Sequence, residues 1–204
     1  MQYVLITPPT ADVLSLADAK THLRAEDFND DDVLIGSYIR AAQGEIDPAY
    51  GGWLGRALRP QTWELRLDEF PCDLIKLRFP PLISIASITY VDPDGDDQTL
   101  AANTEYRIIN SGSSGPALIV PAYGESWPSV RSDHESVRVR FTSGYPVADP
   151  EGDPPVVDRL PDQIVQWMKL RVGDFYEKRE AVNVGDTPSV LPHIENLLFN
   201  LRIF

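Results

Sequence analysis

Cysteine is nearly absent from this chain, because Cys72 is the only one among 204 residues. A single cysteine excludes an intramolecular disulfide framework and a zinc cluster made from the thiolates of one chain. We expect Cys72 to be a small, partly buried side chain beside Pro71. No run approaches the roughly 18 apolar residues that span a bilayer, and the N-terminus lacks the basic start of a secretory signal. We therefore expect a protein that is made and kept in the cytosol.

Basic residues are scarce: 18 Lys and Arg stand against 31 Asp and Glu, which gives a formal charge of −13. Affinity for phosphate grows with the number of Lys and Arg contacts, so the surface should repel nucleic acid and anionic membranes. Tight DNA binding is disfavoured, although an acidic wall would suit a conduit through which DNA slides. The hydrophobic fraction of 43% is close to that of globular proteins, and we expect one folding unit with appendages.

Motifs that carry catalysis are missing. The run from Gly112 to Gly115 lacks the spacing of a nucleophile elbow, and there is no Walker A loop or G-x-G-x-x-G fingerprint. The three histidines, His22, His134 and His193, lie in different segments without the spacing of a zinc motif. We therefore predict a non-enzymatic chain with no catalytic residues, no cofactor and no metal site.

The acidic run that begins at Asp92 invites a calcium interpretation. Counted from Asp92, however, position six is Asp97 and position twelve is Asn103, whereas an EF-hand loop needs glycine and glutamate there. A hairpin turn explains this run better.

Helical signals lie at both ends of the sequence. Ser15 and Asp18 form a capping-box-like start, which predicts a short helix that runs to about Arg24. Residues 29–32, Asn-Asp-Asp-Asp, supply cap residues and an acidic first turn, which predict the start of a longer helix that Pro48 should stop. Its expected apolar face consists of Ile35, Tyr38, Ile39, Ala42 and Ile46. Residues 160–177 predict a third helix, with Val165, Met168, Val172, Phe175 and Tyr176 on its apolar side.

Between these helices the spacing of apolar residues changes to two, which is typical of half-buried strands. We predict strands over residues 62–67, 75–79, 82–91, 106–109, 117–120 and 137–141. In residues 82–91 the inward-facing side shifts from Ile83 and Ile85 to Ile88 and Tyr90, which indicates a bulge near Ala86.

The pattern predicts an α+β fold in which N-terminal and C-terminal helices form a small bundle beside a β-rich middle. We divide the chain into an N-terminal helical part (1–59), a β-rich region (60–143), a proline-rich connection with the C-terminal helix (144–180), and a C-terminal tail (181–204). The tail is dense in apolar residues after a loose link. Such a segment either folds back on its own core or docks on a neighbour, and the sequence leaves both open.

Four ordered segments suggest a family. They are Ser15 to Arg24 followed by residues 30–35, the junction 54–63, the strand 80–90, and residues 174–180. Together they resemble the head–tail connector proteins, also called adaptor or head-completion proteins, of long-tailed phages and gene transfer agents. The chain departs from that pattern at residues 47–53, where Pro48 and a Gly-Gly pair interrupt a helix that is continuous in the family.

The resemblance implies a structural subunit of a ring, which is expected to be dodecameric. The ring would lie beneath the portal, at the head–tail junction of a virion. The virion would be assembled in the host cytoplasm. Its implied partners are the portal protein, neighbouring copies, and stopper or tail proteins. DNA would only pass through the lumen, and no membrane is involved. The implied docking contacts are Leu197, Leu198, Phe199, Leu201 and Phe204 of the tail, which we expect to be a docking tail.

Two other functions stay open at this point. The chain could be another phage morphogenesis subunit, such as a stopper or a tail terminator. It could also be a hydrolase or a carbohydrate-binding β module that uses Trp53, Trp63, Tyr123 and Trp127, although buried aromatic residues more often belong to a core.

Overall fold

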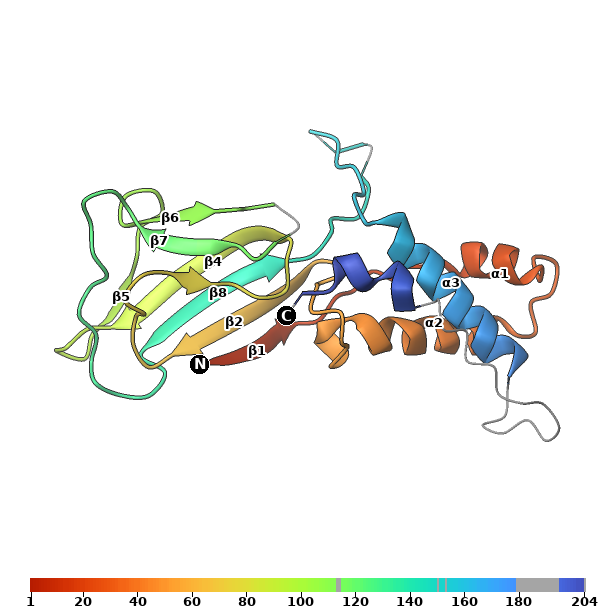
Figure 1. The fold of residues 1–204 in the computed structure, drawn as a ribbon, viewed down its shortest axis with the longest axis horizontal. Helices are drawn as coiled ribbons and strands as arrows, with labels where there is room; N and C mark the ends of the chain where they lie inside the picture. The colour runs from red at the N-terminus through yellow and green to blue at the C-terminus, as the bar shows by residue number, and fades with distance from the viewer. Residues whose placement is uncertain (113–114, 150, 153, 179–194, 204) are drawn as a thin grey trace.

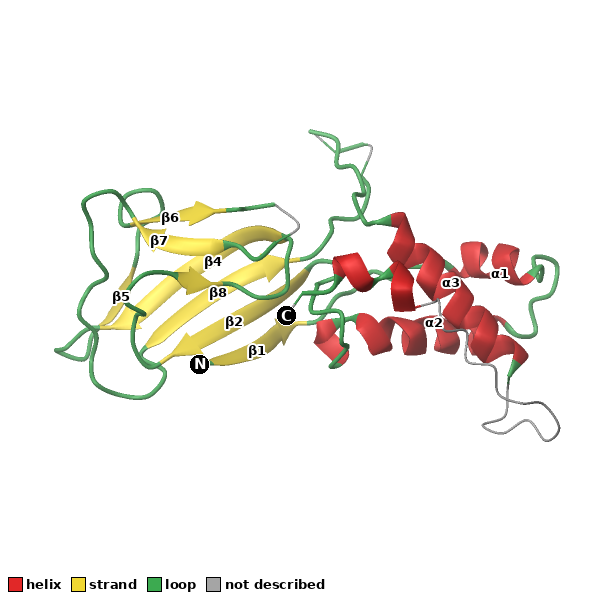
Figure 2. Cartoon of the chain, in the orientation of Figure 1, coloured by secondary structure: helices red, strands yellow, loops and turns green. Residues whose placement is uncertain are grey.

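Strands and helices occupy opposite ends of an elongated molecule (Figure 1). The structure, a computed structural model, describes residues 1–112, 115–149, 151–152, 154–178 and 195–203. Figure 2 shows the strands gathered at one end and the helices at the other, joined by loops. The α+β fold class predicted from the sequence is confirmed. No helix of the described residues is long and apolar enough to cross a membrane.

The strands form two antiparallel sheets. The larger sheet has the order β1-β2-β8-β4-β5, and the smaller one has the order β3-β7-β6. The larger sheet comprises β1 (Gln2–Thr7), β2 (Gln61–Leu67), β4 (Leu82–Val91), β5 (Asp97–Thr99) and β8 (Val137–Ser143). The smaller sheet comprises β3 (Ile75–Lys76), β6 (Tyr106–Ile109) and β7 (Leu118–Pro121).

The two sheets enclose one hydrophobic core. Alternate residues of β2 and β8 face it, so Leu65, Val139 and Phe141 are fully buried, and Ile75 and Ile119 reach it from the smaller sheet. This is the inward–outward alternation that the period of two predicts for paired strands.

Strand β4 is bulged, as predicted. Its register against β8 shifts between Ile85 and Ser87, which confirms the bulge near Ala86. A second shift lies between Leu82 and Ser84, and it turns Leu82 into the core while Ile83 is exposed. The prediction that Ile83 faces inward was therefore wrong, because each extra residue in a bulge reverses the facing of the residues before it.

Strands β1 and β5 were not predicted from the sequence, and β3 is shorter than predicted. Strand β1 pairs with β2 in antiparallel register, with Tyr3 opposite Leu65, so the N-terminal residues belong to the sheet. The acidic run after Asp92 forms the predicted hairpin turn, because the Asp92 Oδ1 atom accepts hydrogen bonds from the backbone N–H groups of Asp94, Gly95 and Asp96. Cys72 is exposed, which corrects the expectation of a partly buried side chain.

The helices form where the sequence predicts, although the third begins two residues later than its predicted start at residue 160. Helix α1 (Leu16–Leu23) begins with the Asp18 N–H donating to the Ser15 hydroxyl at 3.1 Å, and it ends at Arg24 in the left-handed conformation. Helix α2 (Asp32–Ile46) stops before Pro48, and a short 3₁₀ helix, η1 (Pro48–Tyr50), follows it. Helix α3 (Asp162–Glu177) follows the proline-rich connection, which contains neither helix nor strand among its described residues.

The three helices share a second hydrophobic core. The predicted face of α2 is buried there except for Tyr38, which is half-buried. On α3 the most buried side chains include Ile164 and Trp167, which the sequence analysis did not place on its apolar side. An ion pair between Arg171 and Glu45, at 2.7 Å, joins α3 to α2 at the rim of this core.

Glu64 is a buried carboxylate in the middle of β2. Its Oε2 atom is 2.6 Å from Arg140 Nη2 and its Oε1 atom is 2.9 Å from Arg66 Nε. Burial acts to raise the pKa of Glu64, but the hydrogen bonds and charges of Arg140 and Arg66 outweigh burial and hold this pKa below its usual value.

We expect Glu64→Gln to lower the free energy of unfolding by about 2 kcal/mol at neutral pH, because partly exposed arginines would lose their buried partner. A lowered pKa in the folded state gives stability that is present above the unfolded pKa and is lost as the pH falls through the folded pKa. The difference between variant and parent should therefore shrink in acid. Urea unfolding at several pH values measures it, and Glu69→Gln, at an exposed position, is the control. A difference independent of pH would contradict the assignment.

Candidate docking surface at the C-terminal segment

The C-terminal segment, residues 195–203, lies on the helical part of the chain. It forms two short 3₁₀ helices, η2 (Glu195–Leu197) and η3 (Phe199–Leu201), drawn in dark blue beside α3 at the end of the helical part nearer the sheets in Figure 1. The segment contains four of the five residues that the family resemblance implies to be docking contacts. The fifth, Phe204, lies outside the described residues.

These four residues lie in different environments. Leu198 is fully buried in the helical core, and Leu197 and Leu201 are partly buried against it. Phe199 points away from the core, with 74% of its surface exposed. The three leucines therefore hold the segment on its own chain, and Phe199 is the described member that a partner could contact. Whether any of them docks on a neighbour stays a prediction.

Polar contacts hold the end of the segment to the loop of residues 53–56. The Ile203 N–H donates to the Leu54 carbonyl at 2.9 Å, and the Arg56 Nε–H donates to the Leu201 carbonyl at 3.1 Å. The Arg56 side chain is only 2% exposed, and its Nη1 atom donates to the Tyr145 hydroxyl at 2.9 Å. Arg56 thus links the C-terminal segment to the residue that follows strand β8 and Gly144.

Gly55 permits the close approach of this segment. Its φ angle is +70°, and a Cβ atom built on it would lie 2.3 Å from the Ile203 carbonyl oxygen. Any other residue would meet both a left-handed backbone and a backbone clash. The sequence Leu54-Gly55-Arg56 therefore suits a loop against which a second backbone packs.

Asp47 fixes the turn that leads into this loop. Its Oδ1 atom accepts from the Ala49 N–H at 2.9 Å and from Gln61 Nε2 at 3.0 Å, and its carbonyl accepts from the Gly52 N–H. The side chain is fully buried, and this burial raises the pKa of its carboxyl group despite the hydrogen bonds. Residues 47–53, where the chain departs from the family pattern, thus form an ordered turn that ends α2 and presents Trp53.

An exposed hollow lies between Trp53 and the C-terminal segment. Its volume is about 260 Å³, and Trp53, Glu195, Asn196, Phe199 and Arg202 line it. The Arg202 guanidinium lies 5.5 Å from the centre of the Trp53 ring, within the range of a cation–π contact. Two aromatic rings, a cation and a carboxylate side by side can bind a side chain or turn of another protein. We call Trp53, Phe199 and Arg202 the candidate docking surface.

The aromatic residues that could have bound a sugar do not share a surface. Trp63 is buried in the sheet core and its indole donates to Gln61, while Trp127 stacks on Phe70 with ring centres 4.8 Å apart. Trp53 packs on the helical core, and Tyr123 is exposed elsewhere. The structure therefore gives no support to a carbohydrate-binding face.

The histidines likewise fail to form a cluster among the described residues. His22 lies near Gly173 of α3, whereas His134 is exposed beside Asp68 on the sheet, and His193 lies outside the described residues. Within the described part of the chain no group of three or more His, Cys, Asp or Glu side chains could hold a metal ion.

Sequence reasoning missed Trp53 and Arg202 as parts of this surface, and it missed Arg56 as the buried residue that anchors the C-terminal segment beside it. Arg56 stood in the segment that resembles the family, but its burial depends on contacts with residues about 90 and 145 positions away in the sequence. A buried arginine leaves no periodic signal, so only the folded structure could identify it.

Solved structures share this arrangement of sheets and helices. No protein-family model matches the chain, and no curated protein matches it in sequence. A chain of a structure described as the virion of a native gene transfer agent particle matches with a TM-score of 0.74 at 21% identity. Chains from the neck of the empty particle, computed with C6 symmetry, and of the native particle, computed with C12 symmetry, match with TM-scores of 0.72 and 0.70 at 22% and 21% identity.

The fold is shared with chains of these particles. Each match covers 100% of this chain and 96% of the other, so both the sheets and the helical part correspond. At this level of identity the match establishes the fold, and the function requires an argument of its own.

Proposed function

We propose that the chain is a structural head–tail connector subunit of a phage-like particle. It forms a ring beneath the portal, joins the DNA-filled head to the tail, and continues the DNA channel. The observation that carries this proposal is the match over the whole chain to chains of particle and neck structures. The ordered sequence segments that resemble connector proteins support the same assignment independently of the fold.

A ring of copies suits two further observations. Two of the matching structures are necks computed with sixfold and twelvefold rotational symmetry. The chain carries a formal charge of −13, so the lumen of a ring of such subunits would be acidic if its wall has the average composition of the chain, and it would then repel the DNA backbone. DNA would therefore slide through without sequence-specific binding. Neighbouring copies, the portal, and stopper or tail proteins are the partners in this proposal.

The candidate docking surface is where the portal would bind. Phe199 projects from a segment that leucines and Arg56 hold in place, so little ordering is needed when it enters a pocket of the partner. Trp and Arg, present here as Trp53 and Arg202, are among the residue types that most often dominate binding energy, and Phe is enriched in the cores of interfaces.

Mixing the protein with the portal ring of the same particle and imaging the product by electron microscopy tests the proposal. We expect portal rings decorated with density for the connector. We expect Phe199→Ala to fold normally and to weaken portal binding by about 2 kcal/mol, as loss of a central aromatic contact does. Tyr123→Ala, at an exposed position on the sheet part, should bind as the parent does.

The same experiment separates a connector from a stopper or tail terminator. We expect a stopper or a tail terminator, in contrast, to leave isolated portal rings undecorated. Portal rings that stay bare in the presence of the purified protein would refute the connector assignment.

A further inference from the structure

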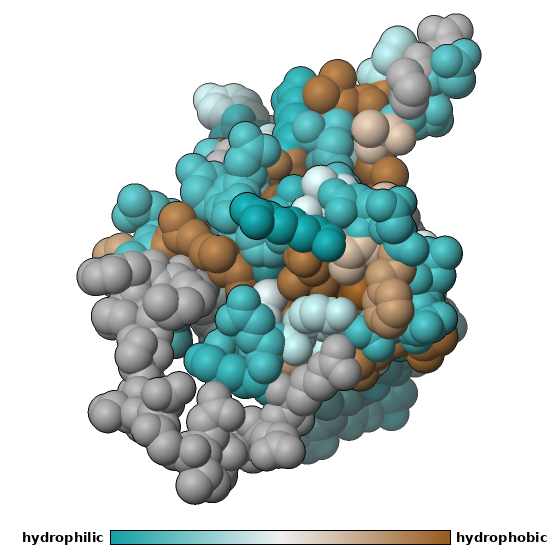
Figure 3. Space-filling model, turned by 90° about the vertical axis from the view of Figure 1, so that its right-hand side faces the viewer, coloured by the Kyte–Doolittle hydropathy of each residue, from teal (hydrophilic) through white to brown (hydrophobic). Residues whose placement is uncertain are grey.

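The loop between α1 and α2 exposes apolar side chains among carboxylates. We call this loop together with the first two residues of α2, residues 24–33, the acidic loop, because five of the ten residues are Asp or Glu. Phe28 is 47% exposed and Val33 is 84% exposed. The loop lies at the end of the helical part farthest from the sheets (Figure 1). Figure 3 views this end, where brown apolar patches interrupt the teal hydrophilic surface.

Contacts to α1 and α3 fix the shape of the acidic loop. The Lys20 ammonium lies 2.6 Å from Asn29 Oδ1 and 2.7 Å from Asp32 Oδ1, and the Tyr176 hydroxyl donates to Asp31 Oδ2 at 2.7 Å. The Phe28 N–H donates to the Ala25 carbonyl. Phe28 is therefore presented on an ordered loop, so binding through it costs little conformational entropy.

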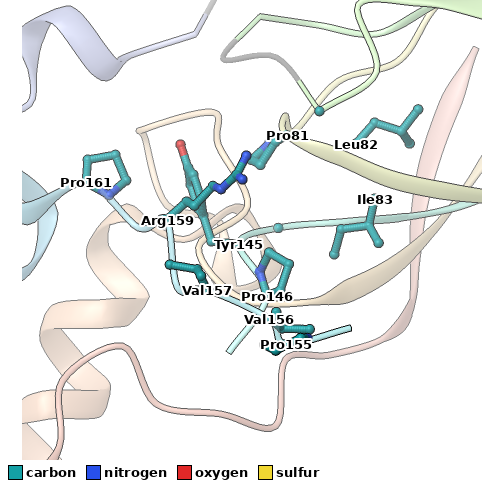
Figure 4. Close-up of a pocket in the computed structure, with 12 residues that line it drawn as sticks. Pro81, Leu82, Ile83, Tyr145, Pro146, Pro155, Val156, Val157, Arg159 and Pro161 are labelled. Atoms are coloured by element: carbon teal, nitrogen blue, oxygen red, sulfur yellow. The ribbon is translucent and has the colours of Figure 1, made fainter. Parts of the chain in front are cut away.

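A groove of about 480 Å³ lies where the proline-rich connection passes the start of β4. We call it the proline groove, because Pro81, Pro146, Pro155 and Pro161 form much of its wall (Figure 4). Ile83, Val156 and Val157 add exposed apolar surface, and Val157 is 67% exposed. Proline rings and β-branched side chains have little freedom to lose, so the groove is formed before anything binds.

The proline groove contains one charged residue among the described residues that line it. Arg159 is exposed, and in Figure 4 its side chain extends across the groove towards Pro81. The neighbouring carboxylate Asp158 already pairs with Arg59, at 2.7 Å. The groove therefore offers an apolar wall and a cation, which complements an apolar side chain flanked by carboxylates.

We infer that the acidic loop of one copy docks into the proline groove of a second copy, with Phe28 against the apolar wall and the loop carboxylates near Arg159. The loop carboxylates complement Arg159, and both surfaces expose apolar side chains. The formal charge of −13 opposes contacts between copies that lack such a match. The loop lies at the far end of the helical part, whereas the groove lies at the boundary between sheets and helices. Because the two surfaces are separated within one copy, the loop of one copy would meet the groove of another. Such a contact is head-to-tail, and it closes into a ring when the rotation between copies permits.

The inference does not rest on the proposed function. A chain could associate in this way without binding a portal, and a connector could form its ring through other surfaces. The test therefore uses the purified chain alone.

Disulfide cross-linking detects the contact. In a Cys72→Ser background, the double variant Phe28→Cys, Val157→Cys should form a ladder of linked oligomers under mild oxidation. The control pairs Phe28→Cys with Tyr123→Cys, because Tyr123 is even more exposed than Val157 but does not line the groove. Adding Arg159→Glu should reduce the yield of the ladder about tenfold by opposing the loop carboxylates. No ladder, or one equal to that of the control, would overturn the inference.

Mixing two broken surfaces provides a second test. Phe28→Asp and Val157→Asp should each be monomeric by sedimentation, because each lacks one half of the contact. Their mixture should form dimers and nothing larger, since one intact loop meets one intact groove. A mixture that stays monomeric would overturn the contact even if portal binding is normal, and dimers without portal binding would refute only the connector function.

Discussion

Gly55→Ala is expected to detach the C-terminal segment from the loop of residues 53–56. The new Cβ atom would lie 2.3 Å from the Ile203 carbonyl oxygen, and alanine disfavours the φ of +70°. Strain and clash together should lower the free energy of unfolding of the helical part by about 3 kcal/mol. Urea unfolding measures this cost, and limited proteolysis should show faster cleavage within residues 195–203.

Gly51→Ala separates the clash from the backbone conformation. Gly51 also has a positive φ, +85°, but nothing lies within 4 Å of an added Cβ atom. Its substitution should therefore cost only about 1 kcal/mol and leave the proteolysis pattern unchanged. If both variants lost the same stability, the backbone conformation alone would explain the effect, and the packing of the C-terminal segment on Gly55 would carry no energy.

The helices were predictable because their signals are local. The Ser15 cap, the acidic start of α2 and the stop at Pro48 all act within a few residues, and the structure confirms each of them. The apolar spacing of α2 also identified the face that packs in the helical core. Local preference and tertiary packing agree here, so either is sufficient to predict the element.

Strand β1 was not predictable in the same way. Residues 2–7 become a strand by pairing with β2, which lies about 60 positions later, and the prolines that follow it shorten the local signal. The facing of Ile83 failed for a related reason. A bulge between Leu82 and Ser84 depends on the register against β8, which the residues of β4 alone do not specify.

The candidate docking surface was only half predictable. The apolar density of the tail predicted that it folds back on its own core or docks on a neighbour, but it could not assign neighbouring residues to opposite sides. Leu198 packs on the helical core while Phe199 faces outward, because a short 3₁₀ turn changes the direction of the side chain at each residue. The role of Arg56 as the anchor of this segment was not predictable, because its hydrogen bond to the Leu201 carbonyl joins residues 145 positions apart in the sequence.

Leu198→Ala is expected to have the largest effect on stability of any substitution in the C-terminal segment. The side chain is fully buried among the helices, so its truncation leaves a cavity and should lower the free energy of unfolding by about 3 to 5 kcal/mol. Unfolding followed by tryptophan fluorescence should report this loss, because Trp53 and Trp167 pack edge to face next to the segment.

Phe199→Ala is the matched control at the next position, because its exposed ring leaves no cavity when it is removed. Its free energy of unfolding should stay within about 0.5 kcal/mol of the parent value. The pair thus separates the two roles that the sequence left open for the tail: Leu198 measures attachment to its own core, and Phe199 measures docking. A Leu198→Ala variant as stable as the parent would show that the segment is not attached, and the exposure of Phe199 would then lose its significance as a presented contact.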